Sequence, residues 1–265
     1  MVTVSREIRR PGTSTRVGTV VAASVSSMAD PLAWLTSLEG VSSAYASTRD
    51  GIDVMLRDRG LRRTSPEMTA ESLLRGAHAS AVLEGSSATA EQVRTGEVDG
   101  IAADAVRLSA TMLALAPLLK TAPLQAIARL HAVVAASTLG PEELGRPRDP
   151  ASADRLRGVA ELLLSDTQAP ALLVAAVAHA DVATAAPFAS HNGIVARALE
   201  RLVLVSRGVD AKSLIVPEAG HLAHRAAYES NLRAYRDGGE RGVHAWALYG
   251  AEAFAAGAEA SPLRS

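Results

Sequence analysis

The chain has 265 residues, of which 48% are hydrophobic and only 3% aromatic, and its formal net charge is -1. This length suits one large domain or two small ones, with enough apolar residues for a real core. The near-zero charge predicts no general affinity for nucleic acid or for an anionic membrane. The lack of cysteine excludes disulfides, a cysteine zinc site and a thiol nucleophile. No apolar run reaches membrane-spanning length and no secretory segment opens the chain, so we expect a cytoplasmic protein.

The N-terminal part is the least regular. A composition rich in alanine and leucine and poor in aromatics favours close-packed helices over sheets. Residues 1–16 are polar and basic and predict a loose tail, while residues 17–23 fit a strand as well as part of a helix. A helix is expected to start at Asp30 and Pro31, and a second helical pattern covers residues 41–61. Residues 1–64 are therefore interpreted as an N-terminal tail with helices.

The clearest helix start is Ser65-Pro66-Glu67, which combines an N-cap residue, a first-turn proline and an early acid. The apolar pattern runs from there to Glu84, and Gly85 provides the stop. A carboxylate in a last turn is disfavoured by the helix dipole, so Glu84 is expected either in water or beside a cation.

Five more helices are predicted after a polar link at residues 86–99. Their expected ranges are 101–119, 124–138, a helix from about 153 through 156–164, 170–185 and 194–205, and residues 215–217 are interpreted as a linking segment. His131 lies on a mostly apolar helix and is interpreted as structural. Trp246 is expected in the core. Residues 256–265 are expected to form a loose C-terminal tail.

Histidines and acids elsewhere do not suggest a metal site. His179 and Asp181 are two residues apart and so face different sides of a helix. His221 and His224 are three apart and could share a helix face, but no further ligand is evident beside them, and a role at a helix start is favoured. The sequence therefore predicts no bound metal.

Residues 186–197 form a loop of small and polar residues that leads directly into an apolar helix. Backbone N–H groups at such a helix start are free and lie at the positive end of the helix dipole, where an anion binds well. Every helix has such an end, so the alternative is a plain interhelix loop capped by Asn192.

This stretch resembles the signature of the Fic (Fido-fold) family, whose members transfer AMP and related groups from nucleotides to hydroxyl side chains. The family signature reads His-Pro-Phe-x-Asp/Glu-Gly-Asn-Gly-Arg-x-x-Arg. The residues that match it in register are Pro187, Phe188, Asn192, Gly193 and Arg197.

Four positions of the signature differ. Ala186 stands where the resemblance places the catalytic histidine, and it cannot act as a general base. Ser190 replaces the metal-binding carboxylate with a weak neutral ligand, so Mg²⁺ is not expected to bind well. His191 replaces a glycine, and Ile194 replaces an arginine that would pair with phosphate. The resemblance therefore implies the frame of the family site without its catalytic residue.

A second motif lies ahead of this site. Ser80 to Gly85 resembles the Ser/Thr-x-x-x-Glu-Gly/Asn inhibitory helix of one class of Fic proteins. In that class the glutamate pairs with the last arginine of the signature and denies it to the γ-phosphate of the nucleotide. The resemblance thus pairs Glu84, supported by Ser80, with Arg197. It covers residues 65–255, which we expect to form one helical domain.

The resemblance implies an all-α Fic fold, with at most a short β-hairpin where Gly145-Arg146-Pro147-Arg148 resembles the opening of the family's target-binding flap. The expected function is a catalytically silent binding or regulatory module with a protein partner, and a homodimer is plausible by resemblance. Its expected ligand is ATP or another nucleotide, and the predicted phosphate-binding residues are Ser190, His191, Asn192, Gly193 and Arg197.

Two alternatives remain open. His191 lies five residues after Ala186 and could serve as a relocated base in an altered nucleotide-dependent transferase. An unrelated helical interaction protein with a chance match to the signature is the other alternative.

Overall fold

The computed structural model describes residues 30–58 and 65–264, and this part of the chain contains helices but no strand. The expectation of an all-α fold is confirmed. The pattern at residues 17–23 and the end of the predicted 41–61 helix lie outside the described residues. The elements are α1 (Ala33–Thr36), α2 (Val41–Asp58), α3 (Pro66–Leu83), α4 (Ala90–Thr95), α5 (Gly100–Thr111), η1 (Met112–Leu115), α6 (Ala116–Leu119), α7 (Pro123–Val134), α8 (Pro150–Leu164), α9 (Ala171–Ala185), α10 (Asn192–Ser206), α11 (Pro217–Ala223), α12 (Arg225–Asp237), α13 (Gly239–Glu259) and η2 (Pro262–Arg264).

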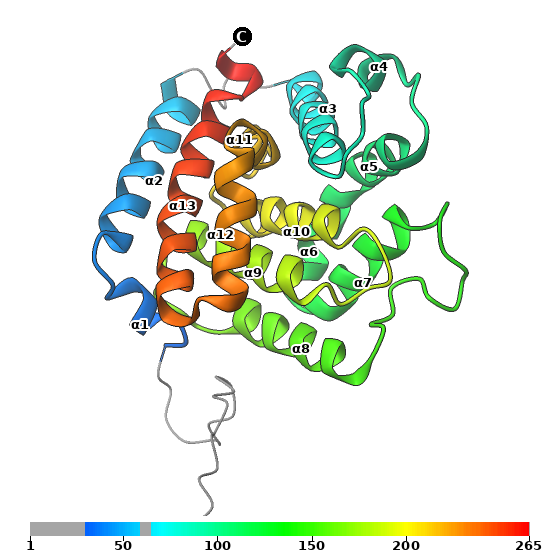
Figure 1. The fold of residues 1–265 in the computed structure, drawn as a ribbon. Helices are drawn as coiled ribbons and strands as arrows, with labels where there is room; N and C mark the ends of the chain where they lie inside the picture. The colour runs from blue at the N-terminus through cyan, green and yellow to red at the C-terminus, as the bar shows by residue number, and fades with distance from the viewer. Residues whose placement is uncertain (1–29, 59–64, 265) are drawn as a thin grey trace, which may run out of the picture.

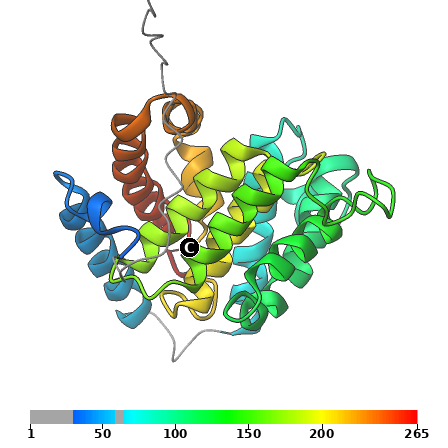
Figure 2. The ribbon, with the colours of Figure 1, turned by 90° about the horizontal axis from the view of Figure 1, so that it is seen from below.

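Helices α9 and α10 pack against each other at the centre of the fold (Figures 1 and 2). Helix α9 is apolar all round, and every residue from Leu172 to Ala180 is buried. A helix with no polar face has to be covered on all sides, and here α8, α10, α12 and α13 cover it. The loop between α9 and α10 is the signature loop, residues 186–191, which is therefore held between the two most buried helices.

The N-terminal helix α2 lies beside α13, although the two are far apart in sequence (Figure 1). Tyr45 and Ile52 of α2 are buried in the shared core. The hydroxyl of Thr48 donates a hydrogen bond to the carbonyl oxygen of Ala251 at 3.1 Å. Helix α2 is thus part of the same packing that encloses α9.

Helix α3 has the boundaries that its sequence signals predict. It begins at Pro66 after an extended Ser65 and ends at Leu83, and Gly85 adopts a φ of +94° that favours glycine. The predicted polar link that follows contains a short helix, α4. Thr89 and Gln92 form a reciprocal capping box there, with bonds of 3.2 and 2.9 Å. This Thr-x-x-Gln spacing was the signal for α4 in the sequence.

The predicted helix at residues 101–119 is divided into α5, η1 and α6. Pro117 has no N–H to donate to the carbonyl of residue 113, which explains the break. By length and composition Gly100–Leu119 could cross a membrane, with a mean hydropathy of 1.4, so the expectation that no run reaches this length was wrong. The segment packs against α3, α7 and α10, which are the contacts of a core segment.

The region of the expected flap, residues 139–149, forms turns without a hairpin. Helix α8 begins at Pro150, where Asp149 accepts a hydrogen bond from the backbone N–H of Ser152 at 2.7 Å. The expected loose tail at residues 256–265 is a misprediction, because α13 continues to Glu259 and Leu263 is buried. Alanine and glycine in that tail allowed helical packing that the sequence pattern did not indicate.

Candidate functional site

The signature loop is fastened by the side chain of Asn192. Its Oδ1 accepts a hydrogen bond from the backbone N–H of Phe188 at 2.8 Å, and its Nδ2 donates to the carbonyl of Phe188 at 2.9 Å. Ala186 and His191, with φ of 43° and 57°, adopt the left-handed conformation that turns the chain on each side of the loop. Asn192 is thus a structural clamp of the loop, which leaves less of its side chain for a ligand.

His131 of α7 contacts the loop through Phe188 and is itself held by the segment around Gly145. Phe188 stacks on His131 with ring centroids 4.1 Å apart, and the backbone N–H of Gly145 donates to Nδ1 of His131 at 2.9 Å. Burial, reinforced by the charge of His191, lowers the pKa of His131 to about 4 despite the opposing contact with the Ser190 backbone. His131 is therefore a neutral buried side chain, as expected for a structural residue.

Arg197 on α10 is buried and every nitrogen of its guanidinium has a partner. Nε donates to Oγ of Ser80 at 2.8 Å, Nη1 donates to the hydroxyl of Tyr228 at 3.1 Å, and Nη2 donates to the carbonyl of Ser80 at 3.2 Å. Nη2 also forms an ion pair with Oε1 of Glu84 at 2.6 Å. Burial lowers the pKa of Arg197, but the interactions with Tyr228 and Glu84 outweigh burial and raise it.

The carboxylate of Glu84 lies beside Gly193 in the first turn of α10. A Cβ at Gly193 would overlap Oε1 of Glu84, so only glycine at this position allows the approach. The first N–H groups of a helix attract an anion, and here a carboxylate of the protein itself lies beside the first turn. The structure thus brings together Ser80, Glu84, Gly193 and Arg197, as the resemblance implied.

His191 belongs to a second polar network. Its Nε2 lies 3.0 Å from Oδ2 of Asp104 on α5, and its Nδ1 lies 2.7 Å from Oγ of Ser190. Asp104 also accepts hydrogen bonds from Arg107 at 2.6 Å and from Ser137. Burial raises the pKa of Asp104, but these three hydrogen bonds outweigh burial and lower it. Sequence reasoning missed Asp104, for which an acid within an apolar helical pattern was the only signal.

The remaining signature positions lack ligand groups for phosphate or metal. Ile194 is buried in the core, with 2% of its surface exposed. Ser190 shares its hydroxyl with His191, and Ala186 has no functional group. The predicted residues therefore fall into two sets, with Arg197 and Gly193 beside Glu84, and Ser190 and His191 beside Asp104.

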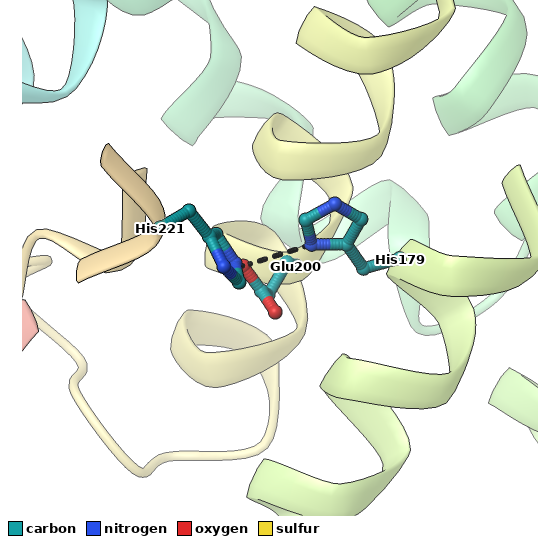
Figure 3. Close-up of side chains that lie close together, drawn as sticks. All are labelled: His179, Glu200 and His221. Atoms are coloured by element: carbon teal, nitrogen blue, oxygen red, sulfur yellow. Dashed lines mark hydrogen bonds and ion pairs between the residues drawn. The ribbon is translucent and has the colours of Figure 1, made fainter. Parts of the chain in front are cut away.

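Helices α9, α10 and α11 meet at a buried cluster of His179, Glu200 and His221 (Figure 3). Nε2 of His221 lies 2.8 Å from Oε2 of Glu200, and Nδ1 of His179 lies 3.1 Å from the same oxygen. The favoured role of His221 at a helix start is a misprediction, because His221 lies in the last turn of α11 and is 1% exposed. Sequence reasoning found no third ligand because Glu200 is 21 residues away from His221.

The carboxylate of Glu200 and the imidazole of His179 have pKa values shifted by their burial and by each other. Burial raises the pKa of Glu200, but the attraction of His221 and His179 and the hydrogen bond with His221 outweigh burial and lower it to about 2. Burial lowers the pKa of His179 to about 4 against the opposing pull of Glu200. The carboxylate is therefore charged and His179 is neutral at pH 7.

The comparisons with known proteins bear on the fold alone. No sequence-family profile and no curated protein sequence matches the chain. Among solved structures, a Fic family protein from Desulfovibrio desulfuricans G20 matches with a TM-score of 0.67 at 16% identity, over 82% of this chain and 73% of that one. A fragment of Fic-1 from C. elegans matches with a TM-score of 0.60 at 18% identity, over 80% of this chain and 71% of that one.

A substituted form of the same C. elegans fragment matches with a TM-score of 0.62 at 20% identity, over 80% of this chain and 69% of that one. These similarities extend over most of each chain, although few residues are identical. The arrangement of helices around the α9–α10 loop is thus shared with proteins of known structure, and this chain has the Fic fold.

Proposed function

We propose that this protein is a catalytically silent Fic-fold module that binds a nucleotide phosphate at Arg197 and acts by regulating a protein partner. The observation that carries the proposal is the ion pair between Glu84 and Arg197 over Gly193. A carboxylate held at the start of α10 occupies the kind of place in which a phosphate oxygen binds. Displacing Glu84 would give an anionic ligand both the guanidinium and the helix dipole.

The chemistry around the loop supports binding rather than transfer. AMP transfer to a hydroxyl requires a base, and Ala186 supplies none. The residues also do not fit Mg²⁺, because Ser190 is hydrogen-bonded to His191 and the carboxylate of Asp104 is taken up by Arg107, Ser137 and His191. Loss of a general base alone lowers a rate by about 10²–10⁴-fold.

Replacing Glu84 with glycine is expected to strengthen ATP binding at least about tenfold, because one charge-assisted contact that competes for Arg197 disappears. AMP should gain less than ATP, because it has fewer phosphate oxygens to reach the guanidinium. Calorimetric titration of ATP, ADP and AMP into the wild type and into Glu84→Gly, with and without magnesium, measures both effects.

Glu97→Gly is the matched control, since Glu97 is exposed and lies in the loop after α4. It should leave every affinity at the wild-type value. If neither the wild type nor Glu84→Gly binds any of the three nucleotides, the proposed phosphate site is wrong. Transfer of labelled AMP by Glu84→Gly would show that the module is not silent.

The His191 network favours one alternative, a nucleotide-dependent transferase with a relocated base. A histidine that contacts a buried carboxylate at one nitrogen and a hydroxyl at the other has the partners of a general base. In any assay that detects transfer, His191→Ala should then abolish it. Undiminished transfer in His191→Ala would eliminate this alternative. Ser190→Ala removes the hydroxyl that contacts His191 but keeps the imidazole, so it shows whether transfer depends on the orientation of His191 or only on its presence as a base.

A further inference from the structure

The cluster of His179, Glu200 and His221 takes no part in the proposed nucleotide site. One side chain comes from each of three helices, and all three are fully buried or nearly so. Figure 3 shows the imidazole rings of His179 and His221 close to the carboxylate of Glu200. The candidate ligand atoms all lie within 4.8 Å of one another. Two imidazoles and a carboxylate form a common donor set for a transition metal.

Two atoms of the cluster lack a hydrogen-bond partner. Nδ1 of His179 is near Oε2 of Glu200, but the two do not have the alignment of a hydrogen bond. Oε1 of Glu200 also has none, although both side chains are 0% exposed. Buried polar atoms are nearly always paired, so two unpaired atoms in one cluster require an explanation. A cation bound by both carboxylate oxygens of Glu200, by Nδ1 of His179 and by Nε2 of His221 would satisfy both.

The distances suit a small ion. Ligand atoms about 2.0–2.1 Å from a tetrahedral Zn²⁺ lie about 3.3 Å from one another. The observed separations of Oε2 from the two nitrogens are 2.8 and 3.1 Å, and all three candidate ligand atoms lie within 4.8 Å of one another, so the side chains can reach one ion after small adjustments. Hard cations such as Mg²⁺ prefer an all-oxygen shell, whereas imidazole nitrogen favours zinc and its neighbours in the transition series.

The groups around the cluster provide the outer partners that a metal-bound histidine needs. The hydroxyl of Tyr228 lies 3.0 Å from Nε2 of His179, and the hydroxyl of Tyr249 lies 2.9 Å from Nδ1 of His221. With Nδ1 of His179 and Nε2 of His221 bound to a metal, the opposite ring N–H groups would donate to these two hydroxyls. Metal-bound histidines nearly always have such an outer acceptor, and its loss weakens binding.

From these contacts we propose that His179, Glu200 and His221 bind one divalent transition-metal ion, with Zn²⁺ as the preferred ion. The ion has a structural role, because it joins α9, α10 and α11 inside the core. It also fixes Tyr228, whose hydroxyl contacts Arg197 at 3.1 Å, and so positions the arginine of the loop site. The buried site has to be loaded while the chain folds.

The first experiment is therefore to express the protein in medium supplemented with Zn²⁺ and to measure the metal in the purified chain by mass spectrometry. We expect about one zinc ion per chain, retained through gel filtration in metal-free buffer. His221→Gln should lose at least nine-tenths of it, while His224→Gln should retain all of it, because His224 is exposed and lies outside the cluster.

A second measurement includes a result on the wild type, which does not depend on a variant that might fail to fold. The wild type produced with Co²⁺ should show the visible absorption of a tetrahedral cobalt site, and Tyr249→Phe should lose the ion to a competing chelator at about 10- to 100-fold lower chelator concentration. A wild-type chain without zinc and without the cobalt spectrum would establish a hydrogen-bonded cluster only and overturn the proposal. Equal metal content in His221→Gln and the wild type would overturn it as well.

Discussion

Glu218→Ala is expected to lower the free energy of unfolding by about 3–5 kcal/mol, because it leaves a buried arginine without its counter-ion. Arg201 on α10 is 1% exposed and pairs in a bidentate manner with Glu218 on α11, at 2.9 and 2.6 Å. Nη1 of Arg201 also donates to the hydroxyls of Ser72 and Ser213 at 3.0 and 2.9 Å. These neutral oxygens cannot replace the lost negative charge.

Helix α3 packs closely against this pair at Gly76. A Cβ at Gly76 of α3 would lie 2.6 Å from Nη2 of Arg201 and 2.9 Å from Oε2 of Glu218. The absence of a side chain at Gly76 thus allows α3 to lie directly against the ion pair and to cover it from water. A buried charge that can neither move nor find a partner carries its full desolvation cost.

The matched control is Glu229→Ala, which removes the partner of Arg225 in an exposed ion pair. The distance from Nε of Arg225 to Oε1 of Glu229 is 2.9 Å, similar to the distances in the buried pair. Both side chains of that pair are 47% exposed, so its loss should change stability by less than about 0.5 kcal/mol. Urea unfolding of the wild type and both variants, monitored by circular dichroism, measures the change in the free energy of unfolding that each substitution causes. Similar small losses in the two variants would contradict the assignment of the Arg201 pair as a buried structural ion pair.

Trp246→Ala is expected to cost about 3–5 kcal/mol of stability through the cavity it leaves. Trp246 is 0% exposed on α13 and is the largest fully buried side chain of the described residues. Its Nε1 donates to the carbonyl of Ala176 on α9 at 2.9 Å, and its ring lies 5.3 Å from that of Tyr249. Alanine would remove both the ring volume and the link between α13 and α9.

Two further substitutions separate the causes. Trp246→Phe keeps an aromatic ring but loses the Nε1 donor and part of the side-chain volume. Its free energy of unfolding should therefore lie between that of the wild type and that of Trp246→Ala. Trp34→Ala removes the other tryptophan, which is 46% exposed, and should cost far less. Thermal and urea unfolding measure the stability change of each variant. Equal effects at Trp34 and Trp246 would contradict the core role of Trp246.

Local sequence signals were sufficient for features whose physical cause lies within one or two helical turns. Ser65 and Pro66 mark the start of α3, and Gly85 marks its end because its φ of +94° favours a residue without a side chain. The short helix α4 had its signal in Thr89 and Gln92, although it was read as a link. The resemblance to a family added the pairing of Glu84 with Arg197, which spans 113 residues.

The sequence by itself therefore determined the helical class, most helix positions and the two motifs that meet at Arg197. Only the tertiary structure decided that His191 contacts Asp104, 87 residues away, and that Glu200 lies between His179 and His221. Helical periodicity shows which face of a helix is apolar, but it does not show which polar side chains of different helices will meet. That outcome depends on the packing of α5, α9, α10 and α11 against one another, and no single helix encodes it.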